Sequence, residues 1–209
     1  MKSKIKNNQK SIIMLVALVL ILTVSVGGTL AYLQTKTDSV TNTFTPSKVT
    51  VYVDEEYNGS TKENVKIKNT GDTEAWIRAV VVVTWQDVNG NVYGQQPVEG
   101  TDYTINYNLN DGWVKGADGF YYWNKPVLSD DEAPNNCSTG VLISSCTAND
   151  TVTVDDTTYY LNVEILGSGI QSKPAEAVDS WDVENVIDLT AVIDSDGNAT
   201  QLNVQNLKN

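Results

Sequence analysis

The chain has 209 residues, with 14 basic and 26 acidic side chains, no histidine and a formal net charge of −12 at pH 7. A chain this acidic repels nucleic acid and anionic membrane surfaces, so neither is an expected partner. Without histidine, the Ser-His-Asp triad, the zinc-protease His-Glu-x-x-His pattern and other histidine-based acid–base chemistry are excluded. The composition therefore favours a protein that is not an enzyme.

Residues 1–31 have the three parts of a secretory signal peptide. Four lysines precede an apolar run from Ile12 to Val26, and small residues then lead to a cut between Ala31 and Tyr32. The run has 15 residues, fewer than the roughly 20 that a bilayer span needs. We therefore expect cleavage rather than a permanent anchor, with membrane contact only before the cut. Loss of the four lysines would leave 10 basic and 26 acidic residues, a net charge of −16.

Apolar and polar side chains alternate repeatedly along the rest of the chain, which predicts strands with one face on a core. The clearest runs are 49–53, 65–68, 103–109 and 159–165. Ala75 to Trp85 is apolar on both faces and is the best candidate for a central strand, where Arg78 would need a carboxylate or carbonyl partner. Turn pairs such as Asn58-Gly59 separate the runs. This pattern predicts an all-β, jelly-roll-like antiparallel β-sandwich over residues 46–209.

Two further elements are expected near the C-terminus. Ser172 could cap a short helix with Pro174 near its start, and Val178 and Trp181 would then face the sheets. Residues 186–207 resemble a hairpin that turns at 195–198. The sandwich should therefore carry one or two short helices and end in a hairpin.

The two cysteines, Cys137 and Cys146, lie in a polar stretch. Outside the cell, this arrangement favours a disulfide that closes a small loop. A metal pair fits less well, because the chain has neither histidine nor a third thiol. Free thiols are the remaining alternative.

Three acidic clusters, at 54–56, 130–132 and 155–156, fall at predicted strand ends or turns. A glycosidase needs only two carboxylates, and Ca²⁺ binds carboxylate oxygens, but none of the clusters matches an EF-hand loop. Solvated turns are the favoured interpretation. We expect no catalytic residue, no resident metal and no cofactor, with Ca²⁺ at these turns as the alternative.

Trp113 and the run from Phe120 to Trp123 place five aromatic rings close to the turn Asp118-Gly119. We favour a hairpin whose alternate rings fill the core. The alternative is an aromatic platform that stacks on sugar rings.

Four stretches carry the motifs of a known family. They are Gly27 to Leu33 with Asp38, Asn42 and Phe44-Thr45; Val65 to Gly71 with Ala75 to Arg78; Gly112-Trp113 with Asp118 to Trp123; and Gly169 to Gln171 leading to Ala177 and Trp181. In these stretches the chain resembles the SipW-dependent exported proteins of Gram-positive bacteria, the family of TasA, camelysin and the BsaA-type biofilm matrix proteins. The last hairpin and the Cys137–Cys146 segment fit the family pattern less well. Camelysin-type members carry a metalloprotease label, which the lack of histidine argues against here.

The resemblance implies a jelly-roll fold, cleavage by the signal peptidase SipW and secretion to the extracellular matrix or cell surface. The implied role is a structural subunit of biofilm matrix fibres, with other copies of the chain and accessory matrix proteins as partners. It also implies that the mature N-terminal segment, residues 32–45, is a donor strand that completes the sheet of the next subunit. The main alternative is a monomeric surface adhesin or carbohydrate-binding module that uses the Trp113–Trp123 aromatic cluster.

The residues of the segment 32–45 suit a donor strand. The segment is rich in β-prone residues and has no glycine or proline before Pro46. Val40 and Phe44 would lie on one face and fill pockets, while the main chain pairs with an exposed sheet edge. Head-to-tail donation need not close, so it would propagate a fibre. The alternatives are that the segment pairs within its own subunit or frays.

Overall fold

The computed structural model describes residues 47–207. They belong to one compact unit, Pro46–Asn209. The predicted signal peptide, its cut between Ala31 and Tyr32, and the donor-strand residues Val40 and Phe44 lie outside the described residues. No helix within residues 47–207 is long and apolar enough to cross a membrane.

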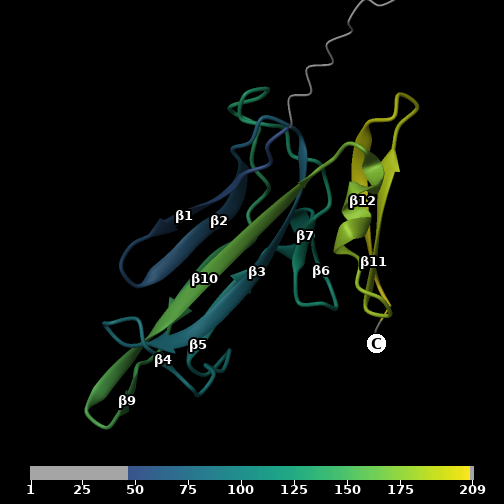
Figure 1. Cartoon of the computed structure of the whole chain (residues 1–209). Helices are drawn as coiled ribbons and strands as arrows, with labels where there is room; N and C mark the ends of the chain where they lie inside the picture. The colour runs from purple at the N-terminus through teal and green to yellow at the C-terminus, as the bar shows by residue number, and fades with distance from the viewer. Residues whose placement is uncertain (1–46, 208–209) are drawn as a thin grey trace, which may run out of the picture. The chain divides into compact units, whose positions relative to one another are not determined.

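The described residues form an all-β sandwich of antiparallel strands, which confirms the predicted fold class (Figure 1). One sheet has the order β1-β2-β8-β5, and the other has the order β6-β7-β3-β10-β9, with β4 paired to β3. The strands of the first sheet are β1 (Val51–Tyr57), β2 (Thr61–Asn69), β8 (Ile143–Ala148) and β5 (Tyr103–Tyr107). The second sheet contains β6 (Trp113–Lys115), β7 (Tyr121–Trp123), β3 (Ala75–Gln86), β10 (Thr157–Gln171), β9 (Val152–Val154) and β4 (Val92–Tyr93). Two short 3-10 helices, η1 (Leu109–Asp111) and η2 (Ala175–Trp181), and the hairpin β11 (Ile187–Ile193) and β12 (Ala199–Asn206) complete the fold.

Strand β3 is central, as predicted from its two apolar faces. It pairs with β10 along its whole length and with β7 on its other side. Its side chains contribute to two cores. Ile77 and Ala79 pack between the two sheets, whereas Trp76 faces a second core that hairpin β11–β12 and η2 cover. A strand buried on both faces requires a partner layer on each side, which explains its continuous apolar sequence.

Arg78 on β3 is held by aromatic rings, so the predicted carboxylate or carbonyl partner is wrong. Its guanidinium carbon lies 4.2 Å from the centre of the Phe120 ring and 4.4 Å from that of Trp181. Its Nε donates a hydrogen bond to Ser168 Oγ at 3.3 Å. Within residues 47–207 the three ion pairs all involve lysine. Stacked rings can accept a guanidinium charge through their π faces, which removes the need for a carboxylate.

The short helix was predicted correctly, but its cap was not. Val178 and Trp181 of η2 are buried in the second core. The N-cap position is Pro174, with no side-chain cap hydrogen bond. Ser172 is itself buried, and its Oγ donates to Glu74 Oε1 at 2.5 Å. Because this bond uses the hydroxyl, Ser172 ties the end of β10 to the start of β3 instead of capping the helix.

The predicted C-terminal hairpin is present, and its loop is closed by one carboxylate. Asp194 accepts hydrogen bonds from the backbone N–H groups of Asp196 and Asn198 and from the Asn198 side chain. Asp87 makes the same set of bonds with Asn89 and Asn91 in the loop between β3 and β4. These bonds favour the ionised form, so they lower the pKa of both carboxyls.

We therefore expect Asp194→Ala to destabilise the fold in a pH-dependent way. The folded pKa lies below the unfolded value of 3.8, so the stabilisation is present above that pH and is lost as the pH falls through the folded pKa. At pH 7, Asp194→Ala should unfold at a lower urea concentration than the wild type. Near pH 2, the two proteins should unfold at the same urea concentration. Asp196→Ala is the control, because Asp196 contributes only its backbone to this loop. A gap independent of pH would contradict the assignment.

Candidate functional site

Strand β10 has an unpaired edge. It pairs with β3 from Tyr160 to Gln171 on one side, but on the other side it pairs with β9 only from Thr157 to Tyr159. From Leu161 onward, this second side has no strand partner among the described residues. An unpaired edge presents a row of free N–H and C=O groups, which is a template for another strand.

The hydrogen-bond register decides which residues present these groups. In an antiparallel pair, the N–H and C=O of successive residues point alternately toward the partner and away from it. The Ser172 N–H bonds to the Glu74 carbonyl at 3.0 Å, so the even-numbered residues of β10 point toward β3. The backbone groups of Leu161, Val163 and Ile165 therefore point to the open edge. Their side chains belong to the core between the sheets.

At one end of β10, the start of β1 packs over the face of the strand that points to the core between the sheets. A Cβ atom at Gly169 would lie 2.7 Å from Val49 Cγ1, and one at Gly167 would lie 3.4 Å from Val51 Cγ2. The two glycines therefore let the chain before β1 approach β10 closely. Toward the tip of hairpin β1–β2, the hairpin and β10 separate (Figure 1). The part of the unpaired edge that lies away from this contact runs from Leu161 to Ile165.

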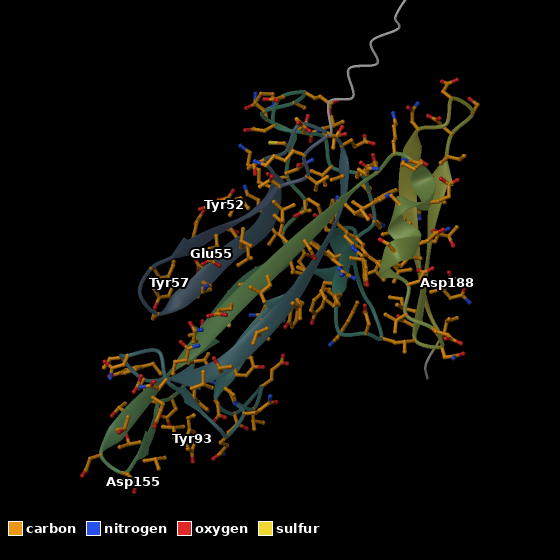
Figure 2. The ribbon with its side chains drawn as sticks, viewed as in Figure 1. Tyr52, Glu55, Tyr57, Tyr93, Asp155 and Asp188 are labelled. Carbon is orange, nitrogen blue, oxygen red and sulfur yellow. The ribbon has the colours of Figure 1, made fainter. Side chains whose placement is uncertain are left out.

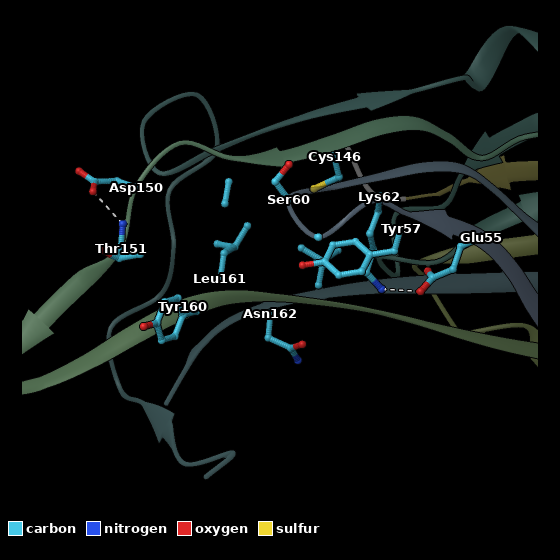
Figure 3. Close-up of a pocket in the computed structure, with 13 residues that line it drawn as sticks. Glu55, Tyr57, Ser60, Lys62, Cys146, Asp150, Thr151, Tyr160, Leu161 and Asn162 are labelled. Atoms are coloured by element: carbon cyan, nitrogen blue, oxygen red, sulfur yellow. Dashed lines mark hydrogen bonds and ion pairs between the residues drawn. The ribbon is translucent and has the colours of Figure 1, made fainter. Parts of the chain in front are cut away.

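A pocket of about 460 Å³ lies where the hairpin tip and β10 separate (Figure 3). Leu161 from β10, Cys146 from β8 and Tyr57 from the hairpin tip point toward one another across it. The lining residues are Glu55, Tyr57, Gly59, Ser60, Lys62, Cys146, Ala148, Asp150, Thr151, Tyr160, Leu161, Asn162 and Val163. The pocket therefore adjoins the open edge and continues the space between the sheets.

Strand irregularities place charge in this pocket. The β1–β2 register shifts between Asp54 and Glu56, and Asn64 adopts a left-handed φ of 55°. Lys62 pairs with Cys146, whose side chain is buried in the core, so Lys62 turns toward the same inner face. There its Nζ contacts Glu55 Oε1 at 2.7 Å, near the hairpin tip that Figure 2 labels at Glu55 and Tyr57. Bulges commonly re-aim side chains in this way beside functional sites.

The predicted disulfide between Cys137 and Cys146 is not formed; both thiols are free and buried. Cys137 lies beside Asn69, whose N–H bonds to its carbonyl at 2.7 Å, and Cys146 pairs with Lys62. These two partners are seven residues apart on β2, about 23 Å along an extended strand. A disulfide requires Cα atoms within about 7 Å of each other. The intervening chain follows β2 instead of closing a loop, and burial raises the pKa of both thiols.

The aromatic cluster forms a core hairpin, as the favoured interpretation predicted. Strands β6 and β7 pair, with Trp113 opposite Trp123. Trp113, Tyr121, Tyr122 and Trp123 are all buried. Phe120 is partly buried against Arg78. In this fold these five rings do not form the exposed platform that sugar binding would need.

The three acidic clusters serve structural roles. Asp54 contacts Lys66 at 3.3 Å, and Asp130 contacts Lys68 at 2.8 Å, a bond that lowers the pKa of Asp130. Asp155 and Asp156 both have positive φ and form the tight turn between β9 and β10 (Figure 2). Within residues 47–207, no three His, Cys, Asp or Glu side chains gather in a group that could hold a metal ion.

Comparison of the chain with protein-family models, with curated proteins and with solved structures found no match. The resemblance to the SipW-dependent matrix proteins therefore stays a prediction from the sequence motifs. The open edge of β10 and the adjoining pocket are the candidate functional features among the described residues.

Proposed function

We infer that this protein is a secreted structural subunit of extracellular biofilm matrix fibres. SipW-type cleavage between Ala31 and Tyr32 would free the segment 32–45, which then adds as a strand to the next subunit. Other copies of the chain are the main partners, and accessory matrix proteins could bind the ends of the fibre. The observation that carries the proposal is the open edge of β10 from Leu161 to Ile165 beside an unfilled pocket.

The chemistry of the edge suits strand addition. Leu161, Val163 and Ile165 direct three N–H and three C=O groups away from β3. Each backbone hydrogen bond to an incoming strand would contribute about 0.5–1.5 kcal/mol net. Apolar side chains of the incoming strand would contribute more by covering the inner face of the sandwich. The contact joins different surfaces on the two subunits, so it can repeat without closing into a ring.

The first experiment is electron microscopy of three purified proteins. The chain from Tyr32 to Asn209 should form fibres, whereas the chain from Pro46 to Asn209 should stay monomeric. A third version, in which a Gly/Ser linker of equal length replaces residues 32–45, separates chain length from strand formation, because such linkers are flexible coils. We expect it to remain monomeric as well. Circular dichroism should show the same β signal for all three.

Two outcomes would overturn the proposal. Fibres from the Gly/Ser version would show that residues 32–45 are not the donor. If the Tyr32–Asn209 chain stays monomeric at high concentration, the fibre function is wrong, and the monomeric adhesin becomes the favoured alternative.

A further inference from the structure

The unpaired edge of β10 is long and lacks the features that usually protect an edge strand. It begins at Leu161, soon after the residues that β9 covers, and continues to Gln171 at the end of the strand. Its sequence, LNVEILGSGIQ, contains no proline and no lysine, and Glu164 is its only charged residue. Its pairing with β3 shows no register shift. Since natural edges are usually protected by proline, lysine or a bulge, this edge favours pairing with another strand.

A second copy of the same edge fits this stretch in one register. The outward N–H and C=O groups belong to the odd-numbered residues, so odd residues must face odd residues in an antiparallel pair. With Leu166 on a two-fold axis, Leu161 of one copy faces Gln171 of the other, and the outward groups between them find partners. A shift in one direction would drive the second copy into β9. A shift in the other direction would leave outward groups unpaired.

The apolar side chains on the outer face match in this register. Leu166 is 54% exposed, and it lies beside the half-buried Val80 of β3. On the axis, Leu166 would contact Leu166 of the second copy. The two Val80–Leu166 pairs would then join into one apolar stripe across four strands. Burial of this apolar surface on both copies would stabilise the pair.

The charges match as well. In the same register, Glu164 of one copy would face Ser168 of the other. Ser168 Oγ accepts the hydrogen bond from Arg78 Nε at 3.3 Å, so the Glu164 carboxylate would arrive beside the Arg78 guanidinium. Aromatic rings hold Arg78 in the single subunit, and no ion pair within residues 47–207 involves it. The second copy would add a charge-assisted contact there.

We propose that two copies of this chain pair edge to edge through residues 161–171 of β10, with Leu166 on the two-fold axis. The contact is the same on both copies and closes on itself, so it stops at a dimer. This inference goes beyond the proposed function and rests on the described residues alone. The dimer would occupy the edge that an added strand needs, so dimer and fibre exclude each other. Because the contact is small, we expect a Kd of about 0.1 mM and dissociation at the concentration of about 1 µM used for electron microscopy.

Disulfide cross-linking tests the register in the Pro46–Asn209 chain, which contains both hydrophobic cores. Leu166→Cys places two thiols in a non-hydrogen-bonded pair whose Cα atoms are about 4.5 Å apart, within the range of a disulfide. Copper(II)–phenanthroline in air oxidises such a pair, removing two electrons and two protons, with oxygen as the acceptor. We expect a covalent dimer at high protein concentration. The wild type should give none, because Cys137 and Cys146 are buried.

Two further variants check the register. Glu164→Cys alone should give no covalent dimer, because its two copies would lie four residues apart along the pair, about 13 Å. When it is mixed with a Ser168→Cys chain that carries a size tag, a covalent heterodimer should form. A covalent dimer from Glu164→Cys alone, or none from Leu166→Cys, would overturn the inference.

Sedimentation from micromolar to millimolar concentration measures the affinity without cross-linking. Leu166→Asp places two carboxylates opposite each other and should raise the Kd at least tenfold. Val88→Asp, in the loop after β3 and 84% exposed, adds the same charge away from the edge and should change the Kd less than twofold. Equal effects, or a wild-type chain that stays monomeric at millimolar concentration, would overturn the inference.

These outcomes are separable from those of the proposed function. Fibres from the Tyr32–Asn209 chain without a Leu166→Cys dimer would overturn the dimer and leave the fibre function intact. The covalent dimer without fibres from the wild type would support the dimer and reject only the fibre function.

Discussion

Leu161→Pro is expected to abolish fibre formation while the subunit stays folded. The Leu161 N–H points to the open edge, so proline removes a donor that an incoming strand needs, and its ring occupies the approach path. The hydrogen bonds to β3 come from the even-numbered residues of β10 and are retained. Proline is tolerated on an edge strand when its missing N–H would face away from the ladder.

Matched variants isolate the effect of the backbone. Leu161→Ala loses the same partly buried side chain but keeps the N–H, so it should assemble, with a higher critical concentration. Asn162→Pro would remove an N–H that points to Thr84 on β3, so it breaks a ladder hydrogen bond in the middle of the sheet, and we expect it to unfold at a clearly lower urea concentration than the wild type. Urea unfolding gives the free energy of unfolding of Leu161→Pro, Leu161→Ala and Asn162→Pro. Electron microscopy shows which of these variants form fibres. Equal assembly of Leu161→Pro and Leu161→Ala would show that this edge is not the acceptor.

The strands were predictable because the alternation of apolar and polar residues indicates directly which side chains are buried. Val65, Ile67 and the apolar faces of Ala75 to Trp85 point to cores that the structure contains. The pocket was not predictable from the same pattern. Continued alternation from Lys66 and Lys68 would put Lys62 in solvent, whereas the irregularity at Asn64 turns it inward. Such an irregularity leaves only a weak trace in a sequence, because Asn tolerates positive φ but does not require it.

Pairing partners were the other feature that local patterns did not reveal. The alternation over 159–165 predicted β10, but it could not predict that β9 would begin only at Val152 and leave Leu161 to Ile165 unpaired on this side. The cysteine prediction failed for a related reason. A spacing of nine positions between two thiols allows either a loop or an extended strand, and only pairing with β2 selects the strand.

Asn69→Asp is expected to lower the free energy of unfolding by about 3 kcal/mol or more at pH 7. Asn69 is fully buried, and its Nδ2 donates to the carbonyls of Thr73 and Val127 at 2.8 and 3.0 Å. Its Oδ1 accepts the Gly71 N–H at 3.0 Å. A carboxylate has the same shape but no donor, so it would place a buried charge against two carbonyl oxygens.

The stability that Asn69→Asp loses should depend on pH in a defined direction. Two facing carbonyls and burial disfavour the ionised form, so the new carboxyl should have a folded pKa above its unfolded value. The penalty is then fully present above the folded pKa and shrinks as the pH falls below it, because the protonated acid can donate one bond. Asn149→Asp is the control, since its side chain is exposed and donates only to the Thr101 carbonyl. A change of less than about 0.5 kcal/mol is expected there.

Asn69 also connects stability to the proposed assembly. Its turn holds Gly71 so close to the entering chain that a Cβ there would lie 2.2 Å from the Lys48 carbonyl oxygen. The same turn lets the Thr70 and Asp72 N–H groups bond to the carbonyls of Thr50 and Lys48. These contacts fix where the N-terminal segment leaves the body. Asn69→Asp chains that remain folded should therefore release this segment in variable directions, and we expect their fibres to be shorter than those of Asn149→Asp at equal concentration. Fibres of equal length from both variants would show that assembly does not depend on a fixed exit point.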